Sequence, residues 1–111
     1  MIEKFKPAFS GIVLGLKDAG IRLQFILASL AVIAGFIMHL SSGEWIAVVI
    51  CIALVISSEI LNTCIEKVCD LYSTEEHEQI RVIKDLAAGA VFAASAGALI
   101  TALIILVRHL S

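Results

Sequence analysis

Three long stretches of this chain carry almost no charge, and each is long enough to cross a membrane. They cover about residues 23–40, 45–65 and 86–107. Crossing the hydrocarbon core of a bilayer takes about 20 apolar residues. Hydrophobic residues make up 60% of the chain and charged residues only 16%, which is typical of an integral membrane protein. We therefore expect an all-α membrane protein with three transmembrane helices, in which residues 1–111 form a single domain.

The segment before the first apolar stretch has a different pattern. In about residues 3–17, apolar side chains recur at helical spacing with lysines between them. A helix of this amphipathic kind can lie in the headgroup region of a bilayer. We predict an interfacial surface helix ahead of the three spanning helices.

The basic residues predict how the chain is oriented. Seven of the eight Lys and Arg residues precede the first apolar stretch or lie between the second and the third. The positive-inside rule places both segments, and so the amino terminus, in the cytoplasm. The net charge of −2 gives no reason to expect a nucleic acid as partner.

Polar side chains form a stripe at the end of the second stretch: Glu59, Asn62, Glu66 and Asp70. At 100° per residue they fall within about 80° of one helix face. Charged groups in or near lipid are costly, so they usually face a bundle interior and mark function. Carboxylates and an amide suit a hard cation such as Mg²⁺ and the phosphates it carries. The alternative is a packing network, but such networks mostly use uncharged polar residues.

The chain has neither a GxxxxGK[ST] nor a GxGxxG motif. Any phosphate chemistry must therefore be carried out without a standard nucleotide-binding fold. Phosphoryl transfer is mostly positioning and charge neutralisation. Glu66 with a second carboxylate would hold the metal, and Lys84 would contact the phosphates. Glu59 lies deepest in the apolar run and is the candidate proton acceptor.

These residues carry a resemblance to a known family. The segment Glu59-Ile60-Leu61-Asn62-Thr63-Cys64-Ile65-Glu66, followed by Asp70, Lys84-Asp85 and Ala88-Gly89-Ala90-Val91, resembles the prokaryotic diacylglycerol kinases, a family that includes the undecaprenol kinases. The resemblance implies an ATP-dependent lipid kinase with three spans per subunit. It also implies a homotrimer with active sites shared between subunits, in the bacterial inner membrane.

The resemblance also implies a role for each matching residue. Glu59 is the general base with Asn62 as supporting amide; Glu66 and Asp18 bind the Mg²⁺ of MgATP; Lys84, Asp85, Glu75 and His77 bind the nucleotide; and Arg22 and Asp70 lie with Glu59 at the lipid substrate. One position departs from the family pattern. Asp18 begins a DxxxR motif where the family has ExxxR, so its carboxylate reaches less far.

The lipid acceptor stays open. The interval from Asp70 to Lys84 is similar to the diacylglycerol kinases, whereas Asn62-Thr63 is similar to the undecaprenol kinases. We expect diacylglycerol, which would give phosphatidic acid, with undecaprenol as the alternative. Two other classes remain: a small proton-coupled exporter, which usually needs four spans, and a non-catalytic assembly factor, which would bind no nucleotide.

Two further expectations concern the third spanning helix. Lys84 and Asp85 are expected at its start, with Asp85 in the first turn complementing the helix dipole. Gly89, Ala93 and Gly97 form a ladder of small residues four apart, which predicts close approach of another helix.

Overall fold

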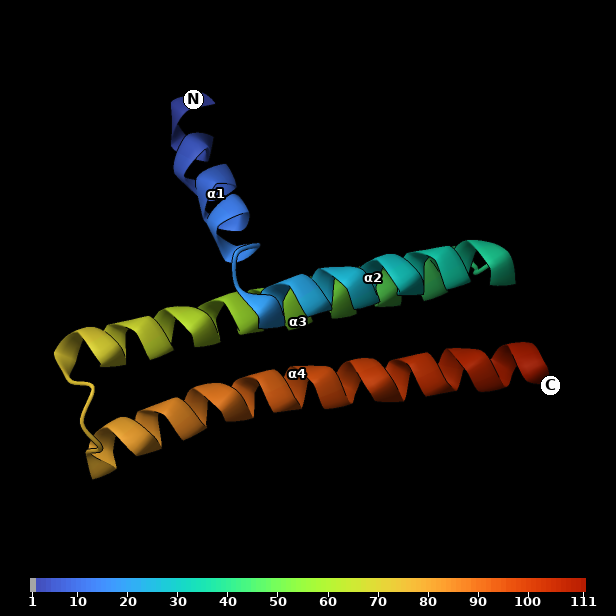
Figure 1. Cartoon of the computed structure of the whole chain (residues 1–111). Coiled ribbons are helices and arrows are strands. Elements are labelled where there is room, and N and C mark those ends of the chain that lie inside the picture. Colours follow the sequence, from blue (N-terminus) through green and yellow to red (C-terminus); the bar gives the residue numbers. More distant parts are fainter. Residues whose placement is uncertain (1) are drawn as a thin grey trace.

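Four helices joined by short turns make up the protein, in a computed structural model that describes residues 2–111. They are α1 (Ile2–Gly15), α2 (Ala19–Met38), α3 (Ser42–Tyr72) and α4 (Glu78–Leu110). The last three are long and apolar enough to cross a membrane, which confirms the all-helical class and the three candidate spans. α3 packs against both α2 and α4, and α2, α3 and α4 run in alternating directions (Figure 1). The amino end of α2 and the α3–α4 turn therefore lie towards the same end of the bundle.

Side chains at the helix starts explain where α2 and α3 begin. Asp18 caps α2, because its Oδ2 accepts a hydrogen bond from the backbone N–H of Ile21 over 3.1 Å. Ser41 and Glu44 form a reciprocal capping box at the start of α3. Each cap satisfies backbone N–H groups that the helix itself leaves without a partner.

α3 and α4 are longer than the apolar stretches predict. α3 continues to Tyr72, and α4 starts at Glu78, so only residues 73–77 connect them. The expectation that Asp85 lies in the first turn of α4 is therefore wrong. Hydropathy marks where a helix stops being apolar, whereas the helical hydrogen bonds continue into the charged segment. The two helices extend past the start of α2 as a hairpin (Figure 1), which we call the α3–α4 hairpin end (residues 60–86).

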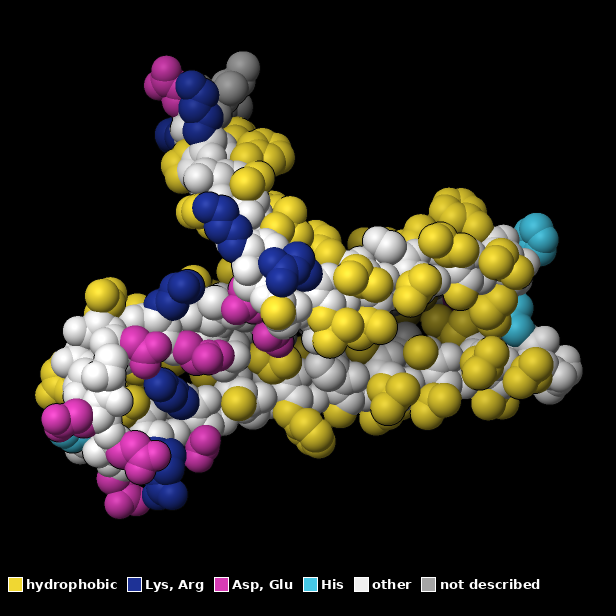
Figure 2. Space-filling view, viewed as in Figure 1, with side chains coloured by type: hydrophobic (Ala, Val, Ile, Leu, Met, Phe, Trp, Pro, Cys, Tyr) yellow, Lys and Arg dark blue, Asp and Glu magenta, His cyan; other side chains and the backbone are white. Residues whose placement is uncertain are grey.

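Charge is concentrated in one half of the molecule. Figure 2 shows acidic and basic side chains gathered on the α3–α4 hairpin end and at the junction of α1 with α2, with hydrophobic side chains over most of the remaining bundle surface. This agrees with a bundle whose apolar part faces lipid. The surface placement of α1 and the trimer stay predictions.

α1 projects away from the other helices (Figure 1). Its end is tied to α2 by Arg22, whose Nη1 donates to the backbone carbonyls of Leu16 and Lys17 over 3.1 and 3.0 Å. Ile21, only 1% exposed, fills the junction beneath. The α1–α2 turn is thus held by both a polar clamp and a buried side chain.

Among the described residues, the glycines of the small-residue ladder on α4 have no close neighbour from another helix. A methyl group built at Gly89 or Gly97 would meet nothing within 4 Å. Gly89, Ala93 and Gly97 are all exposed. The ladder therefore lies on the surface of α4, away from α2 and α3.

Candidate functional site

The polar stripe of α3 starts beside the first turn of α2 and runs outward along the α3–α4 hairpin end. Within it, Asn62 Nδ2 donates a hydrogen bond to Glu66 Oε1 over 2.7 Å. The two residues are four apart on one helix, so the helix geometry itself brings them together. The amide holds one oxygen of the Glu66 carboxylate in place, and the side chain is otherwise exposed to solvent.

A second pair connects the stripe to α4. Lys84 Nζ donates to Asp70 Oδ1 over 3.1 Å, between helices that the 73–77 turn brings side by side. The side chains are 39% and 57% exposed, so the ion pair adds little to stability. Its consequence is geometric: Asp70 holds the ammonium group on the stripe side of α4, where it is also attracted to Glu66.

Glu59 turns away from this pair and towards α2. A methyl group built at Gly20 would lie 2.7 Å from Glu59 Oε1 and 3.2 Å from Asp18 Oδ2. The two carboxylates therefore meet beside the first turn of α2. Glu59 is half-buried there, and the negative charges of Asp18 and Glu66 repel its own.

Asp18 and Arg22 have structural partners in this arrangement. Asp18 is occupied as the cap of α2, and the described contacts place it beside Glu59 while none joins it to Glu66. The guanidinium of Arg22 binds the carbonyls of Leu16 and Lys17 in the turn between α1 and α2. Asp18 and Arg22 therefore each have a structural role, in addition to the predicted role of Asp18 as a metal ligand and of Arg22 at the lipid substrate.

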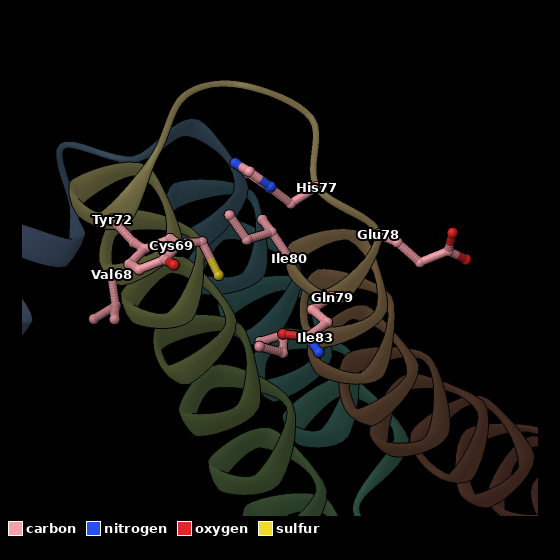
Figure 3. Close-up of a pocket in the computed structure, with 8 residues that line it drawn as sticks. All are labelled: Val68, Cys69, Tyr72, His77, Glu78, Gln79, Ile80 and Ile83. Carbon is pink, nitrogen blue, oxygen red and sulfur yellow. The ribbon is translucent and has the colours of Figure 1, made fainter.

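A cavity of about 450 Å³ lies under the α3–α4 turn (Figure 3). It is lined by Val68, Cys69, Tyr72, His77, Glu78, Gln79, Ile80 and Ile83. The rings of His77 and Tyr72 meet edge to face with their centroids 6.3 Å apart. Of the four predicted nucleotide residues only His77 lines this cavity.

The other three nucleotide candidates lie outside the cavity. Lys84 is paired with Asp70. Glu75 lies exposed in the turn, where its backbone N–H donates to Ser73 Oγ. Asp85 is exposed on α4. Tyr72 and Gln79 line the cavity without having been predicted, and their positions on either side of the turn become visible only once the hairpin is formed.

The carboxylates of the stripe fit Mg²⁺ only if the ion arrives bound to a nucleotide. Among residues 2–111, no three His, Cys, Asp or Glu side chains converge closely enough to hold a metal ion. Mg²⁺ in phosphate-transfer sites, however, is usually held by one or two carboxylates together with substrate phosphates and water. Glu66, with one oxygen fixed and the side chain exposed, fits a metal that arrives on a nucleotide.

The sequence comparison decides the family. The family model described as "Prokaryotic diacylglycerol kinase" matches residues 6–106, which is most of the chain. The chain belongs to this family. The match includes every residue of the stripe, both ends of the Lys84–Asp70 pair and the Gly20 contact, so the geometry above is that of a prokaryotic diacylglycerol kinase family member.

A curated relative is also similar to the chain. It is the "Undecaprenol kinase" of Bacillus subtilis (strain 168), 41% identical over 64 residues. The aligned region covers 58% of this chain and 52% of the relative, so the chain matches about half the length of that protein.

Proposed function

We propose that this protein is an ATP-dependent kinase that phosphorylates the hydroxyl group of a membrane lipid alcohol. The observation that carries the proposal is the layout of the stripe. A half-buried carboxylate, Glu59, lies beside the start of α2, and the Asn62–Glu66 and Asp70–Lys84 pairs follow along the hairpin end. With this layout, Glu59 would meet the lipid hydroxyl next to the apolar bundle, and the two pairs would meet phosphate groups towards water.

Each group has a separate task in this proposal. Glu59 accepts the proton of the lipid hydroxyl, because it is the stripe carboxylate nearest the apolar region. Lys84, oriented by Asp70, neutralises phosphate charge. Glu66 would hold Mg²⁺ with Asp18 as a second carboxylate, and the metal supplies charge neutralisation on the triphosphate. Asn62 keeps the Glu66 carboxylate oriented.

In this proposal the cavity under the α3–α4 turn would hold the base of the nucleotide. Its lining combines apolar side chains with the rings of Tyr72 and His77, which suits a flat aromatic group. On α3 it is lined by Val68, Cys69 and Tyr72, so it lies beyond Glu66 along the helix and at the level of Asp70. At 100° per residue, Val68 and Tyr72 face roughly 120–160° away from the middle of the stripe, so a triphosphate from this cavity would have to cross the edge of α3 beside Asp70 and Lys84 to reach the acceptor.

We propose undecaprenol as the lipid acceptor. The named function of the Bacillus relative supports it, together with the Asn62-Thr63 pair. Diacylglycerol, the acceptor expected first from the sequence, is supported by the description of the family model. The exporter alternative usually needs four spans, whereas the described residues contain three candidate spans.

A direct assay tests this function. The purified chain in mixed micelles is given MgATP labelled at the γ-phosphate and either undecaprenol or diacylglycerol. We expect label in the undecaprenol fraction, and a loss of turnover of at least about 100-fold in Glu59→Gln. Glu76→Gln, which removes an exposed carboxylate of the turn, is the matched control and should keep full activity.

Two results would overturn the proposal. If the parent chain labels neither lipid, the proposed kinase activity is wrong. If it also fails to bind MgATP, a non-catalytic assembly factor is favoured. Near-normal turnover in Glu59→Gln would remove Glu59 as the proton acceptor. Preferential labelling of diacylglycerol would keep the kinase but overturn undecaprenol as the acceptor.

A further inference from the structure

A groove of about 480 Å³ lies in the apolar part of the bundle, separate from the cavity under the α3–α4 turn. Its floor is α3, and its walls are α2 and α4, which each pack on α3 and hardly on one another (Figure 1). No charged side chain is among the described residues that line it. Small side chains keep the walls low: Ala28 and Ala31 on α2, and Ser95, Ala98 and Ala102 on α4.

The floor of the groove continues the polar stripe towards the middle of the span. It is formed by Val48, Cys51, Ile52, Val55 and Ile56. At 100° per residue, these side chains and those of the stripe have mean directions within about 10° of each other. One face of α3 is therefore apolar up to Ile56 and carries the stripe from Glu59 onward.

The groove begins at the level of Glu59. The Lys84–Asp70 pair fixes the register of the antiparallel helices α3 and α4. Eleven residues further into the bundle on each helix stand Ser95 and Glu59, which therefore lie at the same level. From there to Val48 the groove extends about 16 Å along α3, roughly half the thickness of the hydrocarbon core of a bilayer.

The opposite side of α4 is the one suited to a second subunit. The small-residue ladder of Gly89, Ala93 and Gly97 lies about 170° around the helix from the wall residues Ser95, Ala98 and Ala102. A subunit contact at the ladder would leave the groove open. Hydrocarbon is the material that surrounds the span, and the groove ends beside the candidate proton acceptor.

We propose that this groove binds the first part of the hydrocarbon tail of the lipid alcohol, with its hydroxyl at Glu59. The proposal rests on the proposed function and adds the part of the substrate that decides which alcohol is accepted. Lipid tails are as apolar as the groove, so a tail gains no hydrophobic free energy by entering it. Acceptors are therefore selected by how well the tail packs. Only the first 16 Å or so contribute, because the rest of the tail stays in the bilayer.

The first test varies the tail. The parent chain in mixed micelles is given MgATP and a series of alcohols of the accepted class with tails of increasing length. We expect KM, expressed as a mole fraction in the micelle, to fall until the tail spans the groove and then to stay constant. A KM that does not depend on tail length, or that keeps falling for tails much longer than the groove, would overturn the proposal.

The second test shortens the groove. Ala31 lines its far end, whereas Ala34, also an exposed alanine of α2, lies outside its lining. We expect Ala31→Leu to raise KM for a long-tailed acceptor about tenfold. KM for MgATP and for an alcohol whose tail ends before Ala31 should stay within about twofold, which also shows that the variant is folded. Ala34→Leu is the matched control and should equal the parent.

Two results of this comparison would overturn the proposal. One is equal KM values for the long-tailed acceptor in Ala31→Leu and Ala34→Leu. The other is a change in the number of subunits in Ala31→Leu alone, measured by light scattering, because the groove would then be filled by a second copy of the chain.

A binding measurement without ATP separates this proposal from the proposed function. Cys51 lines the groove, and Cys64 is exposed outside it. The accepted alcohol should slow the modification of Cys51 by N-ethylmaleimide severalfold and leave Cys64 unchanged, as followed by mass spectrometry. A parent chain that phosphorylates no alcohol but shows this protection would lose the proposed function and keep the tail groove. An active parent in which Cys51 is not protected would overturn the groove alone.

Discussion

Glu66 has an amide as its described partner, whereas Asp70 pairs with the ammonium group of Lys84 and Asp18 accepts from the backbone N–H of Ile21. We predict that Glu66→Gln raises the Mg²⁺ concentration for half-maximal phosphorylation at least about tenfold. The glutamine keeps an oxygen that accepts from Asn62, so only the charge is lost. A Mg²⁺ titration of lipid phosphorylation measures the effect, with Glu76→Gln as control. An unchanged titration would argue against metal binding by Glu66.

At the scale of helices, a polar contact between α3 and α4 lies at the end of the bundle opposite the stripe. His109 Nε2 lies 3.0 Å from both carboxylate oxygens of Glu44, which is only 6% exposed and also belongs to the capping box of α3. The last turn of α4 is thereby attached to the first turn of α3. A buried carboxylate that loses a hydrogen-bonding partner is left poorly compensated.

We predict that His109→Ala lowers the unfolding temperature in detergent by about 5 °C. Glu44→Gln should lower it as well, and the double substitution should cost less than the two single effects added together, because they share one contact. Circular dichroism during heating measures all three. Arg108→Ala, an exposed neighbour, is the control. Additive losses would show that His109 and Glu44 act independently.

At the scale of the whole molecule, few side chains are buried, and the small-residue ladder of α4 faces outward. We expect this face to bring together subunits of the proposed homotrimer, since small residues let membrane helices approach closely. Ala93→Leu should convert the trimer to smaller species, as measured by light scattering in detergent. Ala34→Leu, at an exposed alanine of α2, is the control. A trimer that persists in Ala93→Leu would place the subunit contact elsewhere.

Much of the architecture could be predicted because hydropathy and charge act locally along the chain. The three apolar stretches correspond to α2, α3 and α4. The helical spacing of 100° per residue placed Asn62 and Glu66 on one face, where they form a hydrogen bond that was not itself predicted. The helix ends were predicted less well. Lys84 and Asp85 lie inside α4, because helical hydrogen bonding does not stop where hydropathy falls.

The site was predictable where its residues belong to one helix and less so where helices meet. The Lys84–Asp70 pair, the Tyr72–His77 ring contact and the approach of Glu59 to Gly20 all join separate elements. The Ser41–Glu44 capping box was not predicted, although it has a local S-x-x-E pattern. His109, which contacts Glu44, is 65 residues away, and no local pattern indicates it. Gly20 had no signal beyond being a glycine after a capping aspartate.

The sequence by itself determined which segments are apolar helices, which face of α3 carries the carboxylates, and the family to which the chain belongs, because these depend on residue order and helical periodicity alone. Only the tertiary structure decided that Glu59 turns to α2 while Glu66 stays with Asn62, and that Lys84 is held by Asp70. Those choices depend on where α2 and α4 meet α3, and helix packing is set by side chains far apart in the chain.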